Sequence, residues 1–159
     1  MIILDTNVIS EPLRPRPGAG VVTWLDAQAV ETLYLTTISL AEVRYGIACL
    51  PKGRRQQELH DRFEGEFVPL FHGRTLAFDE PATTAYAALR AQARAQGLAI
   101  GDFDALIASI ASVTGFTVAT RDTAPFEATG VAVVNPFDES ERPQPCSGGT
   151  TLERDPTMP

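Results

Sequence analysis

Short apolar runs in this chain alternate with longer stretches in which apolar residues recur every three or four positions. Short runs bounded by Gly, Pro or charged residues are typical of strands that are buried on both faces of a parallel sheet. Stretches with the longer repeat are typical of amphipathic helices. The short runs predict strands at residues 2–4, 33–37, 116–120 and 130–134, and a short strand or extended segment at residues 67–71.

The stretches with helical spacing fall between these runs. They predict helices near residues 21–25, 39–50, 57–63, 81–96 and 105–113. Ser39 is expected to cap the second helix, and Asp79 or Glu80 is expected to open the fourth. Because strands that alternate with helices form mainly parallel sheets, we predict an α/β fold with a mainly parallel central sheet flanked by helices.

Composition indicates one folded domain and a tail of different character. The 159 residues, of which 44% are hydrophobic, suffice for one ordinary core, and we expect a single domain over residues 1–137. The remaining segment is rich in charged residues, Pro, Ser and Gly, and its apolar surface is too small to offset the entropy lost on ordering. We therefore predict a disordered tail at residues 138–159.

The overall charge argues against a broadly basic surface for nucleic acid. The formal net charge is -7 and the pI is about 4.8, whereas affinity for phosphate normally comes from clustered Lys and Arg. A nucleic-acid substrate would therefore need metal ions. Two local basic clusters occur, and a solvated loop is the simpler interpretation of each. They are Arg14 with Arg16, and Lys52 with Arg54 and Arg55.

The sequence lacks the patterns of a secreted or membrane protein. Asp5 interrupts the first apolar run, no basic segment precedes it, and no apolar run is long enough to span a bilayer. Cys49 and Cys146 form no CxxC pair and have no zinc-ligand spacing, which favours a reducing compartment. We expect a cytoplasmic protein that does not associate with membranes.

Four carboxylates are expected to meet at one edge of the predicted sheet. Asp5 and Asp122 each follow a strand, Glu42 lies in the first turn of a helix, and Asp104 lies at a helix start. Parallel strands end at the same edge, where α/β proteins bind ligands. Clustered carboxylates repel one another, so such a cluster is stable mainly when a divalent cation neutralises it. Oxygen ligands without His or Cys favour a hard ion, Mg²⁺ or Mn²⁺.

Each acid also has a structural interpretation. Glu42 ends a Ser-x-x-Glu spacing typical of a capping box, which makes capping the favoured role from spacing alone. Either Asp102 or Asp104 is equally well explained as a helix cap or first-turn acid. Asp122 fits an ordinary turn. Asp5 is the hardest to explain structurally, because an acid beside a buried strand needs hydrogen bonds, a pairing partner or a cation.

Five short motifs follow one another along the chain. They are Ile3-Leu4-Asp5-Thr6-Asn7, Ser39-Leu40-Ala41-Glu42-Val43 with Gly46 one turn later, Asp104-Ala105-Leu106-Ile107-Ala108, Thr120-Arg121-Asp122 and Val134-Asn135-Pro136. No motif is specific alone, but the ordered set closely resembles a PIN-domain protein of the VapC or FitB toxin type. The resemblance covers nearly everything up to Phe137.

The resemblance implies a PIN-like three-layer sandwich and a Mg²⁺- or Mn²⁺-dependent endoribonuclease that is the toxin of a toxin–antitoxin pair. It carries over Asp5, Glu42, Asp104 and, as a weaker ligand, Asp122 as the acidic metal site and catalytic residues. We expect the first three to hold a Mg²⁺ ion that binds a phosphate oxygen and activates a water, which Asp122 orients or deprotonates for attack on the phosphodiester.

Three further residues have expected supporting roles. Thr6 and Asn7 match family positions that support the first acid through hydrogen bonds, although a helix-start role explains Asn7 about as well. Members of the family usually have one acid in the third motif, whereas this chain has two. The register of the following apolar residues aligns Asp104, so Asp102 becomes a candidate for an acid outside the direct ligand set.

The resemblance also implies partners: an RNA substrate, a second copy of the chain in a homodimer, and a cognate antitoxin whose C-terminal segment enters the acidic groove. Two other functions stay open. One is a catalytically silent module that binds RNA or protein. The other is an aspartyl-phosphate phosphatase with Asp5 as nucleophile. The second is weaker, because such enzymes need another acid two residues after the nucleophile, where this chain has Asn7.

Overall fold

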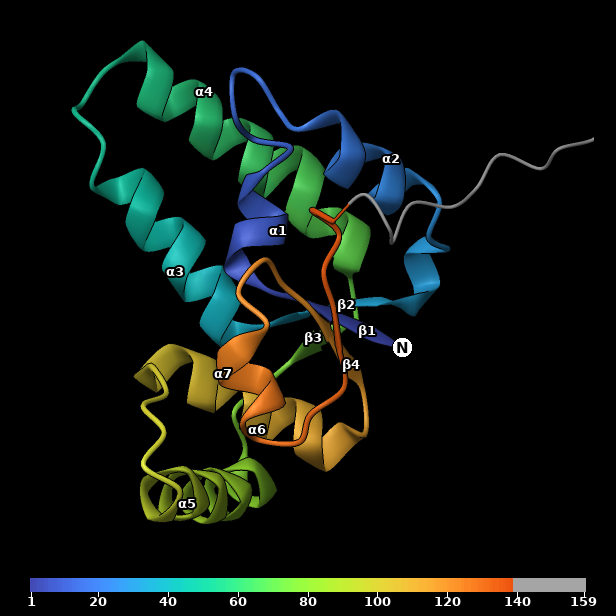
Figure 1. Cartoon of the computed structure of the whole chain (residues 1–159). Helices are drawn as coiled ribbons and strands as arrows, with labels where there is room; N and C mark the ends of the chain where they lie inside the picture. The colour runs from blue at the N-terminus through green and yellow to red at the C-terminus, as the bar shows by residue number, and fades with distance from the viewer. Residues whose placement is uncertain (139–159) are drawn as a thin grey trace, which may run out of the picture.

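Five short parallel strands form the central sheet of the computed structural model, which describes residues 1–138 (Figure 1). The sheet order is β3-β2-β1-β4-β5, and every neighbouring pair is parallel. The predicted disordered tail lies, apart from its first residue, outside the described residues. The strands are β1 (Ile2–Leu4), β2 (Leu33–Thr36), β3 (Thr75–Leu76), β4 (Thr117–Ala119) and β5 (Val133–Val134).

Helices cover both faces of this sheet and complete the predicted three-layer α/β sandwich (Figure 1). All five predicted helices are present, and the short helices α1 and α7 were not predicted. The helices are α1 (Thr6–Ser10), α2 (Ala19–Asp26), α3 (Thr37–Ala48), α4 (Arg54–Arg62), α5 (Glu80–Ala95), α6 (Asp102–Thr114) and α7 (Ala124–Glu127), with shorter turns η1 (Val30–Thr32), η2 (Phe63–Phe67) and η3 (Val68–Phe71). None of the helices in residues 1–138 combines the length and apolar character needed to cross a bilayer.

The alternation of side chains along the strands divides the core into two parts. Leu4 and Ala119 pack on one face of the sheet with side chains from α1, α2 and α3. Ile3 and Val118 pack on the other face, against α5, α6 and α7. Because successive residues of a strand point to opposite faces, β1 and β4 both need apolar residues on both faces. This explains the apolar run Ile2–Leu4 in β1 and the adjacent apolar residues Val118 and Ala119 in β4.

The extended segment predicted at residues 67–71 is wrong. The chain there continues from α4 into the helical turns η2 and η3. Phe63, Phe67 and Phe71 are spaced four residues apart, and their ring centroids are 5.7 Å and 5.1 Å apart in sequence order. A four-residue spacing is helical, and the aromatic contacts stabilise the helical turns over the β-propensity of the individual residues.

Candidate active site

The order of the strands brings residues from distant parts of the chain to one edge of the sheet. Strand β1 lies between β2 and β4, and all three end at the same edge. Asp5 directly follows β1, Glu42 lies on the helix that follows β2, and Asp122 follows β4. Asp104 reaches the same region from the first turn of α6.

Asp5 is the buried centre of this group, with 5% of its surface exposed. Its Oδ1 accepts a hydrogen bond from the Thr6 backbone N–H at 2.7 Å, which makes it the N-cap of α1. Its Oδ2 accepts from Asn7 Nδ2 at 2.6 Å and from Thr120 Oγ1 at 2.7 Å. Burial raises the pKa of Asp5, these hydrogen bonds oppose the rise, and the nearby Glu42 carboxylate adds to it. All three groups that donate to Asp5 are neutral: a backbone N–H, an amide and a hydroxyl.

Glu42 is not the capping residue that its spacing favoured. The N-cap of α3 is Thr36, whose Oγ1 accepts the Ser39 backbone N–H at 2.9 Å, so Ser39 lies inside the helix. Glu42 consequently lies in the second turn, beyond reach of the N-terminal N–H groups. Its Oε2 instead accepts a hydrogen bond from Thr6 Oγ1 at 2.6 Å. Thr6 was expected to support Asp5, and it does so through its backbone N–H, whereas its hydroxyl binds Glu42.

Asp104 and Asp122 complete the acidic group. Burial raises the pKa of Asp104, and the carboxylates of Asp5 and Asp122 raise it further. The backbone at Gly101 approaches Asp104 so closely that a Cβ there would lie 2.6 Å from Asp104 Oδ2. Glycine at this position therefore leaves room for the carboxylate. Asp104 therefore lies within electrostatic reach of Asp5 and Asp122, and Glu42 lies within reach of Asp5.

Asp102 is not brought into this group. Its Oδ1 forms an ion pair with Arg90 Nη2 of α5 at 3.1 Å, and its side chain is 77% exposed. Both Asp102 and Asp104 are first-turn acids of α6, and neither is its N-cap, which is Gly101. Residues two apart on a helix face different directions, so only one of the two acids can face the sheet edge.

Asn7 connects the two strand ends that carry acids. Its Nδ2 donates to Asp5 Oδ2 and, at 3.0 Å, to Thr120 Oγ1, while its Oδ1 accepts the Arg121 backbone N–H at 3.0 Å. The buried Thr120 hydroxyl also accepts the Asp122 backbone N–H at 3.2 Å. No role was predicted for Thr120, although its position between a strand and an acidic turn indicates a residue at the edge of the site.

Glu11 is a second residue that sequence analysis missed. It is the C-cap residue of α1 and only 4% exposed. Its Oε1 accepts the Gly18 backbone N–H at 2.9 Å, and its Oε2 lies 3.2 Å from both Arg14 Nη1 and Arg121 Nη2. Glu11 therefore ties the loop after α1 to the turn that bears Asp122.

The donor chemistry of the four acids fits a hard divalent ion, because carboxylate oxygens are the ligands that Mg²⁺ and Mn²⁺ prefer. As placed, however, no three His, Cys, Asp or Glu side chains among residues 1–138 are close enough together to hold one ion. The Glu42 carboxylate is held by its hydrogen bond from Thr6. A shared ion would require side chains to turn toward Asp5.

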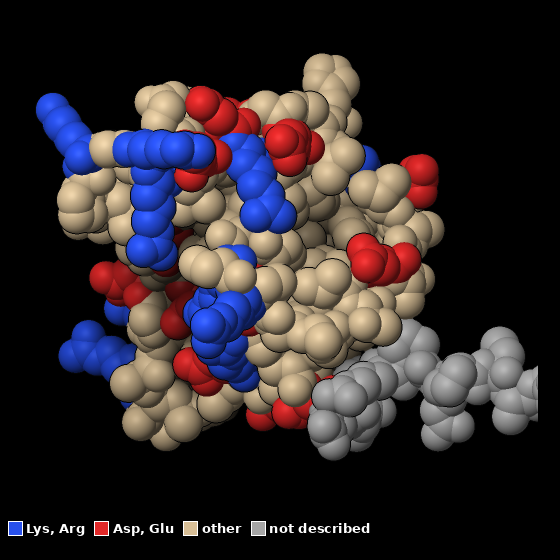
Figure 2. All heavy atoms as spheres, turned by 90° about the horizontal axis from the view of Figure 1, so that it is seen from above, with Lys and Arg blue, Asp and Glu red and all other residues tan. Residues whose placement is uncertain are grey.

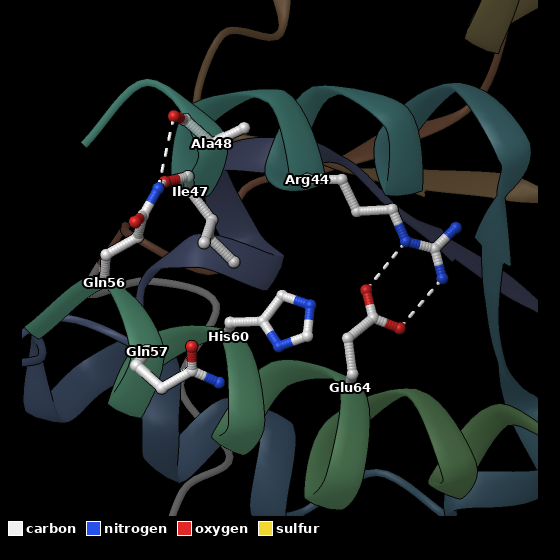
Figure 3. Close-up of a pocket in the computed structure, with 7 residues that line it drawn as sticks. All are labelled: Arg44, Ile47, Ala48, Gln56, Gln57, His60 and Glu64. Atoms are coloured by element: carbon white, nitrogen blue, oxygen red, sulfur yellow. Dashed lines mark hydrogen bonds and ion pairs between the residues drawn. The ribbon is translucent and has the colours of Figure 1, made fainter. Parts of the chain in front are cut away.

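A cavity of about 750 Å³ lies elsewhere, between α3 and α4 (Figure 3). Arg44 and Glu64 face each other across it in a bidentate ion pair, with Nε–Oε1 at 2.7 Å and Nη2–Oε2 at 2.9 Å. Gln56 donates to the backbone carbonyls of Ile47 and Ala48 at its other end. None of the four acids lines this cavity, so it is separate from the acidic group.

Comparison with known proteins identifies the fold family. A family model described as the PIN domain matches residues 2–131. The chain belongs to the PIN-domain family. This PIN domain is 57% identical over 138 residues to the plasmid stability protein StbB of Pseudomonas syringae, covering 87% of this chain and 99% of that protein. It is 50% identical over 139 residues to the toxin FitB of Neisseria gonorrhoeae, covering 87% of this chain and 100% of FitB.

Solved structures of related proteins have the same fold. The crystal structure of FitAcB from Neisseria gonorrhoeae matches this PIN domain with a TM-score of 0.84 at 50% identity, over 86% of this chain and 99% of that chain. The structure of VapBC2 from Rickettsia felis, bound to a DNA fragment from their promoter, matches with a TM-score of 0.68 at 26% identity, over 85% of this chain and 98% of that chain.

Proposed function

We propose that this PIN domain is a metal-dependent endoribonuclease that acts as the toxin of a toxin–antitoxin pair. The observation that carries the proposal is the convergence of Asp5, Glu42, Asp104 and Asp122 at one sheet edge, with Asp5 buried among neutral donors only. The names of two relatives, the toxin FitB and the VapC ribonuclease Y4jK of Sinorhizobium fredii, support the same activity.

Asp5, Glu42 and Asp104 would hold a Mg²⁺ or Mn²⁺ ion, with Asp122 as a weaker ligand. A bound ion supplies positive charge that binds a phosphate oxygen and lowers the pKa of a coordinated water. The hydrogen bonds to Asp5 fix the orientation of its carboxylate and oppose the rise in its pKa that burial causes. Asp122 is exposed, and in this proposal it would orient or deprotonate the attacking water.

The phosphatase alternative is disfavoured by Asn7, which occupies the position where such enzymes need a second acid. The Asn7 side chain forms hydrogen bonds with Asp5, Thr120 and the Arg121 backbone, so it serves to hold the two strand ends together. A catalytically silent module remains the second candidate, supported by the separation of the four acids as placed.

The proposed partners are an RNA substrate, a cognate antitoxin and a second copy of the chain. The solved relatives include complexes of FitB-type and VapC-type proteins with their antitoxins. An antitoxin side chain with a guanidinium group would bind the carboxylates bidentately, in competition with the metal. A cytoplasmic location stays a prediction.

Cleavage of RNA by the purified chain tests the proposal, with Mg²⁺, with Mn²⁺ and with EDTA. We expect new 5′ ends with either metal and none with EDTA. Asp104→Asn should abolish cleavage, whereas the matched variant Asp102→Asn removes an acid two residues away that pairs with Arg90 and should keep it. Cleavage that persists in EDTA, or equal activity of the two variants, would contradict the metal site.

A further inference from the structure

The two basic clusters of the sequence, which are about 40 residues apart in the chain, meet in the folded domain. A cavity of about 300 Å³ is lined by Arg14 from the loop after α1 and by Arg55 and Arg62 from α4. Figure 2 shows several Lys and Arg side chains, with Asp and Glu side chains among them, on the face seen from above, where α2, α4 and this loop lie in Figure 1. The simpler interpretation of two separate solvated loops does not predict this meeting.

A chain of contacts joins this cavity to the acidic group. Arg14 and Arg121 approach the same oxygen of Glu11, each at 3.2 Å, so their guanidinium groups lie side by side. The Arg121 backbone N–H donates to Asn7, which in turn donates to Asp5. Four arginines therefore follow one another from the rim of the acidic group to α4: Arg121, Arg14, Arg55 and Arg62, which we call the arginine track.

The charges of the track are available to a ligand. Arg55 and Arg62 are exposed, and neither forms an ion pair with any residue in the described part of the chain. The guanidinium groups of Arg14 and Arg121 share one carboxylate, which leaves one net positive charge between them. Glu58, which also lines the cavity, is itself paired with Arg54 at 2.6 Å.

A polyanion fits this surface better than a protein does. Protein interfaces are anchored by buried aromatic and other large apolar side chains. The large apolar side chains exposed on the described residues are Met1, Val30, Tyr45, Leu70, Leu98, Phe103 and Val113, and none of them lines the cavity. Leu13, Pro15 and Leu59 also line the cavity, but both leucines are only partly exposed. A row of exposed guanidinium groups is typical of a groove that follows a nucleic-acid backbone.

We propose that the arginine track binds backbone phosphates of single-stranded RNA and leads the strand from the acidic group, across the end of α1, to α4. The proposal rests on the proposed nuclease function, because it names how the same substrate is held outside the site of cleavage. It also accounts for how a chain with a formal net charge of -7 attracts RNA to a carboxylate cluster.

Binding of RNA to the full chain in EDTA tests the track without cleavage. The probes are fluorescent single-stranded RNAs of about 4 and about 12 nucleotides, the range of strand lengths that such grooves hold. The variant is Arg55→Gln with Arg62→Gln. We expect about fivefold weaker binding of the long RNA and unchanged binding of the short one, with a salt dependence of log K lower by about 0.7 for each arginine removed.

Arg62→Gln and Arg94→Gln form a matched pair of single variants. Each removes an exposed arginine from the last turn of a helix, but Arg94 belongs to α5 and does not line the cavity. Only Arg62→Gln should weaken binding of the long RNA. Thermal unfolding should be the same for both variants and the parent, since neither side chain is buried.

Several outcomes would overturn the track. One is that the double variant binds the long RNA with the same affinity and the same salt dependence as the parent. Another is weaker binding only to duplex DNA, or only to the antitoxin, which would assign the arginines to a different partner. If the parent cleaves RNA while the double variant behaves like it, the track alone fails. If the parent neither binds nor cleaves RNA, the proposed function fails with it.

Discussion

Helix α1 carries a buried carboxylate at each end, and the two are stabilised in opposite ways. Asp5 caps the amino end, where free N–H groups and the helix dipole favour a negative charge, and its three donors are neutral. Glu11 lies at the carboxyl end, where the dipole opposes a negative charge. It is balanced by the guanidinium groups of Arg14 and Arg121.

This difference separates a structural carboxylate from a candidate ligand. The charge of Glu11 is neutralised inside the domain, so the residue needs nothing further. Asp5 has hydrogen bonds but no cation, and both its burial and the nearby Glu42 carboxylate raise its pKa. Burial alone does not distinguish the two acids, since both are about 5% exposed or less. The charge of the partners distinguishes them.

The largest effect is expected for the substitution Asp5→Asn, which should reduce RNA cleavage. Cleavage should fall on the order of a thousandfold, because the variant removes the charge that we propose binds the metal. The fold should persist, since the amide oxygen of the new side chain can still accept the Thr6 N–H. The measurement is kcat on an RNA substrate beside thermal unfolding. Glu11→Gln is the control and should keep activity within about tenfold; equal losses in the two variants would invalidate the comparison of the two ends of α1.

Glu11→Ala should have the larger effect on stability. It leaves two guanidinium groups without their shared carboxylate and the Gly18 N–H without an acceptor, and we expect a loss of about 2 kcal/mol in the free energy of unfolding. Urea denaturation measures this loss. Asp26→Ala, which truncates an exposed acid at the end of α2, should change the value by less than about 0.5 kcal/mol. A Glu11→Ala protein as stable as the parent would show that the ion pairs contribute nothing.

Most of the fold could be predicted because burial on two sides leaves a simple pattern. Strands β1 and β4 carry adjacent apolar residues that face opposite sides of the sheet, and helices such as α5 begin and end at recognisable residues. The short helices α1 and α7 have too few residues to show a repeat. The segment at residues 67–71 was misjudged because its helical spacing extends from Phe63, before the predicted segment begins.

The sequence indicated the four acids of the candidate site and two of their partners, Thr6 and Asn7, but not Thr120 or Glu11. Asp5 was recognisable because a carboxylate after a buried strand has few structural explanations. Glu42 was ambiguous because the choice between Ser39 and Thr36 as helix cap depends on a backbone angle, which spacing does not specify. Glu11 and Thr120 could not be assigned, because their roles depend on contacts with residues more than 100 positions away.

The smallest expected effect distinguishes the two acids of α6. Burial and the carboxylates of Asp5 and Asp122 raise the pKa of Asp104, so its charged form costs stability at neutral pH in EDTA. Asp104→Asn should therefore increase the free energy of unfolding at pH 7 by on the order of 0.5 kcal/mol. The gain should disappear as the pH falls through the raised pKa toward 3.8, where the parent carboxyl is also neutral. Asp102→Asn should give no gain, because it removes an exposed ion pair with Arg90. Urea denaturation of both variants across this pH range measures the contrast, and a loss of stability in Asp104→Asn at pH 7 would mean that this carboxylate has an unrecognised stabilising partner.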